Sequence, residues 1–331
     1  MVDLKIKIGS LFAGVGGIEL GFLSQKNFEV SWAVENDKYA QTTYKENFKH
    51  NLIEDNIEKV KGKSLNYVDI LTAGFPCQAF SISGYQKGFT DPRGNLFFEI
   101  IRIINELSKK PKVLFLENVK NLRTHDNKKT YKIIHKKLES LGYYVFTETL
   151  NTSTYTKIPQ NRERTFIICF NKGNHAFKDK AKKMSYSFNQ YFPPKKQSSI
   201  KSFKDLLSKK KVDEKYYYRE DKYNYQELAE AFTNEDIIGQ WRRIKVRINK
   251  SNFCPTLTAN MGTGGHNVPL IRDKYGIRKL TPRECFNFQG FPSNYKLPSK
   301  IPDSQLYKQA GNSVTVDIIK VLAKTILKTF N

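Results

Sequence analysis

The clearest indication of the fold is a short stretch near the N-terminus, Ile6-Lys7-Ile8-Gly9-Ser10-Leu11-Phe12-Ala13-Gly14-Val15-Gly16-Gly17. Residues 5–12 alternate in character, which predicts a β-strand, and the glycines that follow predict a tight turn. A helical pattern begins directly after the turn, over residues 17–24. A strand that leads through a glycine turn into a helix is typical of the first unit of a parallel α/β sheet.

The alternation of strands and helices continues through the first half of the chain. The patterns predict further strands over residues 29–35, 68–75, 113–119, 143–150 and 165–170, and helices over residues 37–48, 95–107 and 128–141. We therefore expect an α/β fold with a doubly wound, mostly parallel sheet that carries helices on both faces. In such sheets the functional side chains lie at the carboxyl ends of the strands.

The character of the sequence changes past the middle of the chain. Residues 171–247 are rich in Lys, Tyr, Asn and Ser and have weak periodicity, which predicts a separate, smaller and irregular module. An amphipathic helix is predicted at the C-terminal end, over residues 314–330. We expect a large domain of residues 1–172 plus 305–331 and a small domain, with its hinge, of residues 173–304.

The composition narrows the class of protein. The 331 residues include 56 Lys and Arg against 32 Asp and Glu, a formal net charge of +24, and 39% are hydrophobic. That hydrophobic content is too high for a disordered polycation, and no apolar run approaches the roughly 20 residues of a membrane helix. Four scattered cysteines and five histidines lack the spacing of a metal site, so we expect no metal. The charge predicts a polyanionic partner, unless it reflects only a Lys-rich proteome. The N-terminus has no signal-peptide pattern, so we expect a cytoplasmic protein.

The first candidate site lies where the first strand ends. Phe12, Gly14, Gly16 and Gly17 belong to a loop whose backbone a ligand can approach closely. Glu35 ends the second predicted strand, where a carboxylate can accept hydrogen bonds from both hydroxyls of a ribose. The pattern departs from G-x-G-x-x-G, and a purely structural turn is the alternative to a nucleoside-containing cofactor.

Side chains that could take part in catalysis also lie at or near the ends of later predicted strands. Cys77 follows the third strand and precedes a polar loop, so it is either a nucleophile with a stabilised thiolate or a buried, inert thiol. Glu117, near the end of the next strand, is either a proton-exchanging acid or part of a satisfied turn. Arg162 and Arg164 share a face if their strand begins early, and either pair with acids or bind a base or phosphate.

Taken in order, these features resemble the DNA (cytosine-5)-methyltransferases, particularly the bacterial enzymes of type II restriction–modification systems. The matching motifs extend over nearly the whole chain. They are Phe12-x-Gly14-x-Gly16-Gly17, Glu35, Asp55, Pro76-Cys77-Gln78, Glu117-Asn118-Val119, Gln160-x-Arg162-x-Arg164, Arg278-x-Leu280-Thr281-x-Arg283-Glu284-Cys285 and Gly311-Asn312-Ser313-Val314. The resemblance implies the fold of the S-adenosylmethionine-dependent methyltransferases, with the variable target-recognition module after residue 171.

The resemblance also implies a reaction. Cys77 would add to carbon-6 of a cytosine flipped out of the duplex, which prepares carbon-5 to receive a methyl group from S-adenosylmethionine. Glu117 would share a proton with ring nitrogen 3, Arg164 would contact the carbonyl oxygen, and Arg162 would help to position the same pocket. Loss of the carbon-5 proton would then expel Cys77, and S-adenosylhomocysteine would be the second product.

A set of cofactor contacts is implied as well. Glu35 would bind the ribose, and Asp55 or the amide oxygen of Asn56 would accept from the adenine amino group, because Asn56 interrupts the family's Asp-Ile pair. Asn36 and Leu96 would lie near the adenine or serve only in packing. The other implied contacts are Phe12, Gly14, Gly16, Gly17, Pro76, Asn312 and Ser313.

Double-stranded DNA is the implied partner. Candidate DNA contacts lie in the loop after Cys77 and in the recognition module, although several of them could equally be ordinary loop residues. They are Ser81, Ser83, Lys87, Arg242, Arg243, Thr256, Leu257 and His266. The resemblance further implies a monomer in the bacterial cytoplasm, with no membrane contact, and a restriction endonuclease as a functional but not a physical partner.

Two other functions stay open from the sequence. One is methylation of cytosine in RNA, such as tRNA, by the same scaffold, and the other is a non-catalytic DNA-binding protein on a decayed methylase fold. The basicity and the large recognition region favour DNA, and the intact Cys77, Glu117 and Arg164 favour an enzyme. A nicotinamide-dependent oxidoreductase is disfavoured by the Pro-Cys-Gln and Gly-Asn-Ser motifs.

Overall fold

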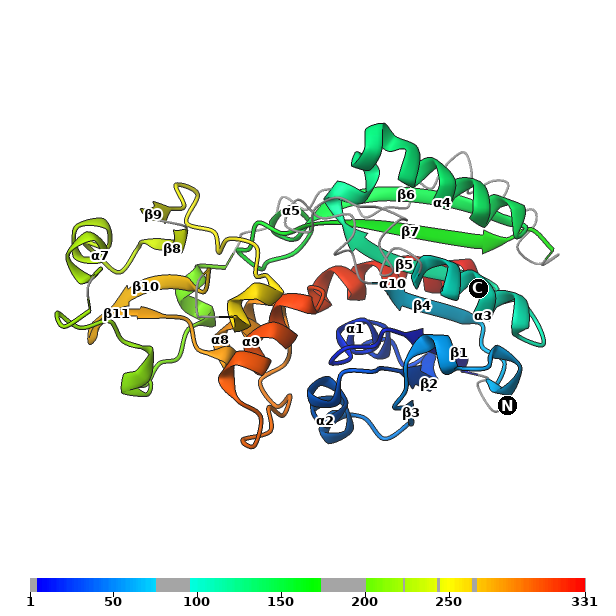
Figure 1. The fold of residues 1–331 in the computed structure, drawn as a ribbon, viewed down its shortest axis with the longest axis horizontal. Helices are drawn as coiled ribbons and strands as arrows, with labels where there is room; N and C mark the ends of the chain where they lie inside the picture. Colours follow the sequence, from blue (N-terminus) through cyan, green and yellow to red (C-terminus); the bar gives the residue numbers. More distant parts are fainter. Residues whose placement is uncertain are drawn as a thin grey trace. The chain divides into compact units, whose positions relative to one another are not determined.

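A computed structural model describes residues 5–75, 96–173, 201–222, 224–242, 245–263 and 267–330 (Figure 1). The chain divides into two compact units. The first comprises residues 1–150, 163–195 and 319–331, and the second comprises residues 151–162 and 196–318. The boundaries predicted for a cofactor-binding and a recognition domain stay a prediction, and each unit is described by itself.

The first unit is built on a seven-stranded sheet of order β3-β2-β1-β4-β5-β7-β6. Its strands are β1 (Ile6–Leu11), β2 (Phe28–Val34), β3 (Asn51–Ile53), β4 (Ile70–Gly74), β5 (Val113–Val119), β6 (Tyr143–Asn151) and β7 (Glu163–Asn171). The pairs from β3 to β5 are parallel, whereas β7 is antiparallel to β5. The predicted doubly wound, mostly parallel sheet is therefore confirmed.

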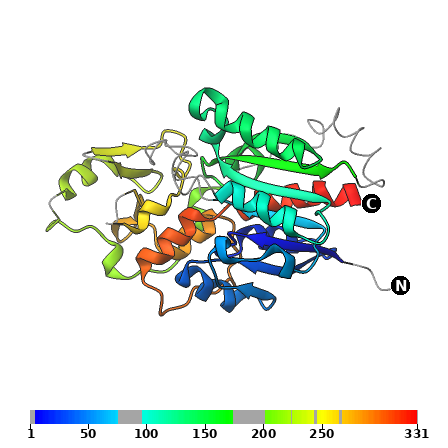
Figure 2. The ribbon, with the colours of Figure 1, turned by 45° about the vertical axis from the view of Figure 1, so that its right-hand side comes forward.

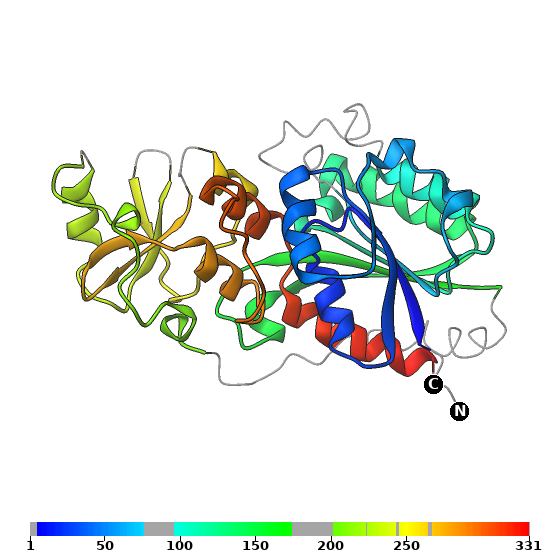
Figure 3. The same cartoon turned by 90° about the horizontal axis from the view of Figure 1, so that it is seen from below.

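Helices cover both faces of this sheet. They are α1 (Gly17–Leu23), α2 (Lys38–Asn47), α3 (Leu96–Glu106), α4 (Lys129–Ser140) and α10 (Val316–Phe330). Leu114 and Leu116 of β5 pack in one core cluster with α3 and α4, whereas Phe115 contacts Phe22 of α1, with ring centroids 5.3 Å apart. Figure 3 shows α1 and the red helix α10 on one face and α3 and α4 on the other. This two-sided burial explains the near-continuous apolar pattern of β5.

A close approach joins the first and last helices of the first unit. A Cβ atom at Gly21 of α1 would lie 2.3 Å from the Cβ atom of Ile319 in α10, so only glycine permits this packing. Figure 2 shows α10 running along the sheet. The described residues of this unit also form short 3-10 helices. These are η1 (Ile57–Lys59), η2 (Gly62–Ser64), η5 (Lys120–Arg123) and η6 (His125–Lys128).

The second unit contains a four-stranded antiparallel sheet of order β11-β10-β8-β9, which the sequence did not predict. Its strands are β8 (Ile238–Arg242), β9 (Lys245–Ile248), β10 (Pro269–Asp273) and β11 (Gly276–Lys279). Its helices are α5 (Thr152–Tyr155), α7 (Tyr225–Ala231), α8 (Pro282–Phe288), α9 (Asp303–Asn312), η7 (Phe203–Leu206), η8 (Glu214–Tyr216) and η9 (Ala259–Gly262). The described part of this unit is thus more regular than expected.

A buried ion pair anchors α8 in the second unit. Arg278 and Glu284 are each 1% exposed, and two hydrogen bonds of 2.8 and 2.9 Å join them. Glu284 also forms a capping box with Thr281 at the start of α8. The Arg-x-Leu-Thr-x-Arg-Glu-Cys motif therefore has a structural role, because it attaches the start of α8 to β11.

Across the described ranges, no helix is both long and apolar enough to cross a membrane.

Candidate active site

The loop after β1 contains a glycine whose backbone is open to a ligand. Gly14 has a φ of +58°, and a Cβ atom built there would meet no described atom within 4 Å. Gly16 has a φ of +78°, and a Cβ atom there would lie 2.1 Å from the ring of Phe48. Phe12 itself has a φ of +56°, which is unusual for a residue with a side chain. The backbone at Gly14 can therefore be approached closely, as a nucleoside site requires.

Glu35 lies beside this loop, held by backbone amides. Its Oε2 accepts a hydrogen bond from the N–H of Gly14 at 2.7 Å, and its Oε1 accepts from Asn36 and Asp37 at 2.9 and 2.8 Å. Burial raises the pKa of Glu35, although the bonds from Asp37 and Gly14 oppose this shift. A carboxylate has about four acceptor positions, so Glu35 can still accept a hydrogen bond from a hydroxyl while it is held by these three amides. These residues fit the ribose of S-adenosylmethionine.

The two candidates for the adenine contact lie in the segment after β3. The amide oxygen of Asn56 accepts from the N–H of Glu58 at 3.3 Å and so caps η1. Asp55 is exposed, and its Oδ1 accepts from the N–H of Asn56 at 2.7 Å. Each of the two side chains thus already accepts a hydrogen bond within the segment, and the choice between Asp55 and Asn56 stays a prediction.

The remaining cofactor candidates differ in their surroundings. Phe12 and Leu96 are partly buried and pack against the main core of the first unit. Asn36 is exposed. Asn312 and Ser313 lie in the second unit at the end of α9, where Ser313 is 8% exposed.

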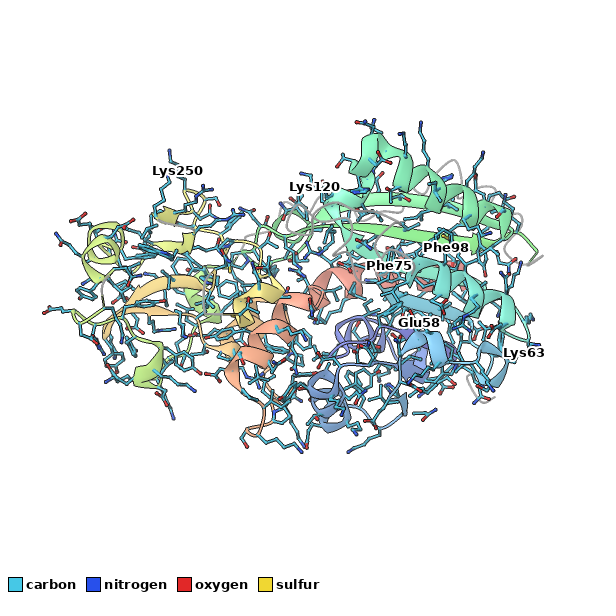
Figure 4. The ribbon with its side chains drawn as sticks, viewed as in Figure 1. Glu58, Lys63, Phe75, Phe98, Lys120 and Lys250 are labelled. Atoms are coloured by element: carbon cyan, nitrogen blue, oxygen red, sulfur yellow. The ribbon has the colours of Figure 1, made fainter. Side chains whose placement is uncertain are left out.

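The ends of β4 and β5 bring an acid next to the strand that precedes the nucleophile motif. Gly74 pairs with Glu117, and a Cβ atom at Gly74 would lie 3.7 Å from the Oε2 of Glu117. Asn118 is buried, and its Nδ2 donates to the carbonyl oxygen of Phe75 at 3.2 Å. Phe75, labelled in Figure 4, directly precedes Pro76. Asn118 stands in the Glu-Asn-Val motif, but the sequence alone does not reveal this contact.

Glu117 and Arg164 form an ion pair at this edge of the sheet. The Nε of Arg164 lies 3.1 Å from the Oε1 of Glu117, and their side chains are 14% and 10% exposed. Antiparallel pairing of β5 with β7 creates the contact, because Val119 lies opposite Arg164. A carboxylate beside a guanidinium can bind a polar heterocycle from two sides, since one accepts and the other donates hydrogen bonds.

Several predicted site residues fall outside the described ranges, and their roles stay predictions. They are Pro76, Cys77, Ser81, Ser83, Lys87, Arg243 and His266. The described cysteines Cys169, Cys254 and Cys285 are fully buried, and burial raises the pKa of each thiol. A nucleophilic thiolate is disfavoured in such surroundings, which leaves Cys77 as the candidate.

Arg162 precedes β7 and does not share a strand face with Arg164. It is 1% exposed, and its guanidinium donates to the carbonyl oxygens of Leu257, Gly311 and Ser313 within the second unit. The two arginines would share a strand face only if β7 included Arg162, but β7 begins at Glu163. These contacts fit a residue that positions the Gly-Asn-Ser segment.

Two buried glutamines extend this network. Gln289 is 0% exposed, and its Nε2 donates to the carbonyl oxygen of Ala310 at 2.7 Å. Its Oε1 accepts from Gln160 and from Thr315, both at 3.2 Å. Gln160 begins the Gln-x-Arg-x-Arg motif, whereas nothing in the sequence analysis pointed to Gln289.

The described DNA-contact candidates divide into exposed and buried residues. Arg242 is exposed at the end of β8, opposite Lys245 of β9. Thr256 is partly buried and donates to the carbonyl oxygen of Asn161. Leu257 is 0% exposed, and its N–H and C=O groups both bond within the unit. The DNA contacts of Arg242, Thr256 and Leu257 stay predictions, with Leu257 buried in this structure. No group of three or more potential metal ligands occurs in the described chain.

Comparisons with known proteins agree with this arrangement. Residues 6–328 match the family model for C-5 cytosine-specific DNA methylases. The chain is 50% identical over 327 residues to the Type II methyltransferase M.Bsp6I of Bacillus sp. (strain RFL6), which covers 98% of this chain and 99% of that protein. It is 39% identical over 349 residues to the Type II methyltransferase M.HhaI of Haemophilus parahaemolyticus, which covers 100% and 99%.

Solved structures share the fold at lower sequence identity. The S. pombe Dnmt2 methyltransferase has a TM-score of 0.73 and 18% identity, covering 99% of this chain and 100% of that one. The Entamoeba histolytica methyltransferase EhMeth has a TM-score of 0.76 and 19% identity, covering 99% of each. Because the family model matches nearly the full length of the chain and relatives are up to 50% identical to it, the chain belongs to the C-5 cytosine-specific DNA methylase family.

Proposed function

We propose that this DNA (cytosine-5)-methyltransferase modifies one cytosine in a short double-stranded recognition sequence through a covalent adduct with Cys77. The pairing of Glu117 with Arg164, where β5 lies beside Gly74 of β4, carries the proposal. In this pair, Glu117 can accept and Arg164 can donate hydrogen bonds to a base, close to the strand that precedes Cys77 in the chain.

The chemistry explains why these residue types are needed. Carbon-5 of cytosine is a poor nucleophile until the Cys77 sulfur adds to carbon-6 and the ring becomes enamine-like. Glu117 would share a proton with ring nitrogen 3 and so neutralise the charge that develops on the ring. After carbon-5 is methylated, its proton leaves, the bond between sulfur and carbon-6 breaks, and the aromatic ring is restored. The thiolate is thereby regenerated.

Arg164 would hold the same base from the other side. Its guanidinium would donate to the cytosine carbonyl oxygen, so the base would replace part of the contact between Arg164 and Glu117. A hydrogen bond to a charged group contributes about 1.5–3 kcal/mol, which helps to offset the few kcal/mol needed to unstack a base. The ion pair would thus keep both groups aligned before the base arrives.

The use of S-adenosylmethionine follows from the family, and the chain offers residues to hold it. When bound, this cofactor supplies an electrophilic methyl group on a sulfonium. Glu35 would accept from the ribose hydroxyls, the backbone at Gly14 would border the ligand, and Asp55 or the amide oxygen of Asn56 would accept from the adenine amino group. The other proposed contacts are Phe12, Gly16, Gly17, Asn36, Asn56, Pro76, Leu96, Asn312 and Ser313.

The proposal extends to the partners of the enzyme. Arg242 and Thr256 would contact DNA from the second unit, with Ser81, Ser83, Lys87, Arg243 and His266 contributing from outside the described ranges. We propose that the enzyme acts as a monomer, without a metal, in the cytoplasm of a bacterium. It would protect DNA from a cognate restriction endonuclease that it does not bind.

Bisulfite sequencing of DNA from cells that express the protein tests the proposal. We expect protected cytosines at one position of one short sequence in cells with the wild-type protein, and none with Cys77→Ala. Tritium transfer from labelled cofactor should go to duplex DNA and not to tRNA. Transfer to tRNA alone would overturn the choice of substrate, and methylation by Cys77→Ala would overturn the mechanism.

A further inference from the structure

Arg102 of α3 uses both terminal nitrogens of its guanidinium to hold one short segment of the first unit. Its Nη1 donates to the carbonyl oxygen of Val60 at 2.9 Å, and its Nη2 donates to that of Ile57 at 2.8 Å. Its Nε donates to Glu99 at 2.7 Å, and its Nη1 also donates to Glu106 at 3.0 Å. Helix α3 is thereby tied to two backbone carbonyls in and directly after η1.

Glu106 holds the next part of the same segment. Its Oε2 accepts from the N–H of Gly62 at 2.7 Å. A Cβ atom at Gly62 would lie 2.6 Å from the Cβ atom of Glu106, so the backbone approaches α3 too closely for any other residue. Glu58 and Lys63, both labelled in Figure 4, lie on this segment. Arg102 and Glu106 together fix residues 57–62.

Arg102 and Glu106, which we call the clamp, stay charged over the physiological pH range. Burial opposes the charge of Arg102, but hydrogen bonds to Glu99 and Glu106 outweigh it, and the pKa of Arg102 lies above its ordinary value. The hydrogen bonds from Arg102 and Gly62 lower the pKa of Glu106. The clamp therefore stays charged and acts as a fixed support.

The clamped segment begins at the proposed adenine contact. Asn56 is the N-cap of η1, and Asp55 bonds to the N–H of Asn56, so the orientation of both residues depends on where η1 lies. We propose that Arg102 is a positioning residue that sets the adenine acceptor of the cofactor site. The inference rests on the proposed function, which assigns the adenine contact to Asp55 or Asn56.

Lysine is a suitable replacement for testing this role. It keeps a positive charge near Glu99 and Glu106 but cannot reproduce the planar fork that reaches two carbonyls. Ile57 and Val60 are 3% and 6% exposed, so their burial keeps the segment attached when the fork is lost. We therefore expect Arg102→Lys to fold and to lose the alignment of η1.

The test compares the wild-type protein, Arg102→Lys and the control Arg219→Lys. Arg219 makes a similar fork in the second unit, with Nε donating to Glu214 at 2.5 Å and Nη1 to the carbonyl oxygen of Tyr275 at 3.0 Å. Calorimetry gives the Kd for S-adenosylhomocysteine and for its inosine analogue, which carries oxygen in place of the adenine amino group. The ratio of the two Kd values measures the contacts to the amino group and to ring nitrogen 1, which becomes an N–H donor in the analogue.

We expect Arg102→Lys to raise the Kd for S-adenosylhomocysteine about tenfold and to reduce the preference over the inosine analogue. Arg219→Lys should leave both Kd values at the wild-type level. An unchanged Kd, or an equal loss for both ligands, would overturn the inference, because an equal loss indicates a merely structural effect. If Arg102→Lys does not fold, Glu106→Gln loosens the same clamp and must reduce the same preference. A wild-type protein that binds neither ligand would overturn the proposed function, and the clamp with it.

Discussion

At the scale of single residues, the pairing of Glu117 with Arg164 makes the acid a point of direct test. We expect Glu117→Gln to lower kcat by about a hundredfold or more, because the amide cannot exchange a proton with ring nitrogen 3. The KM for DNA should change little, since the amide keeps the size and hydrogen-bonding reach of the acid. Steady-state kinetics on a duplex substrate give both values. A variant with wild-type kcat would remove Glu117 from the proposed chemistry.

Glu19 of α1 predicts a pH dependence of stability. It is fully buried, and burial raises its pKa to about 7 from an ordinary value of 4.5, although hydrogen bonds from Ser10 and Tyr44 oppose this shift. The folded state therefore holds a proton that the unfolded state releases between these values. The stabilisation is complete below the unfolded pKa and is lost as the pH rises through about 7.

Glu19→Gln removes this proton equilibrium while it keeps the side-chain shape. We expect the variant to match the wild-type protein at pH 4 and to exceed it by up to about 3 kcal/mol at pH 8. Urea unfolding at both pH values measures the difference. A gap between the two proteins that does not change with pH would show that folding does not raise the pKa of Glu19.

At the scale of elements, the sequence predicted the strands with five or more residues in the first unit, both the fully buried ones and the half-buried edge strand β6. The prediction over residues 113–119 matches β5, where Val113, Leu114, Phe115 and Leu116 are all 0% exposed. The strands that escaped prediction are short and partly exposed. β3 has three residues, none of them buried, and β9 has four, of which three are exposed. Neither offers the apolar periodicity from which strands are recognised.

The candidate site was predictable to the extent that its motifs are local in sequence. Glu35 and Glu117 could be located because each lies where a predicted strand ends. The positioning contacts could not, since they join distant segments: Gln160 meets Gln289, and Arg102 meets Ile57. Only the folded chain shows which buried polar groups face each other.

The network around Gln289 predicts the cost of losing one buried amide. Gln289→Leu would leave the carbonyl oxygen of Ala310 and the donors of Gln160 and Thr315 without their present partner. We expect the free energy of unfolding to fall by roughly 3 kcal/mol, because each buried polar group left unbonded costs about 1–3 kcal/mol. Urea denaturation measures it. Gln226→Leu, on the exposed face of α7, is the matched control and should change stability by less than about 0.5 kcal/mol.

At the scale of the whole molecule, the formal net charge of +24 predicts that DNA binding depends strongly on salt. Each phosphate neutralised contributes about −0.9 to the slope of log K against log salt. If Arg242 contacts a phosphate, Arg242→Ala should reduce the magnitude of that slope by about one, as measured by fluorescence anisotropy on a non-specific duplex. An unchanged slope would exclude a phosphate contact. An unchanged slope with weaker binding to the recognition sequence alone would instead indicate a base contact.

The covalent step is the central claim, and a trapped adduct tests it most directly. A duplex with 5-fluorocytosine at the modified position allows the thiolate to add and carbon-5 to be methylated, but carbon-5 then carries fluorine where a proton must leave. The account predicts that, in the presence of S-adenosylmethionine, mass spectrometry finds the methylated DNA bonded to the sulfur of Cys77. An active enzyme that forms no adduct, or that forms one at another residue, would contradict it.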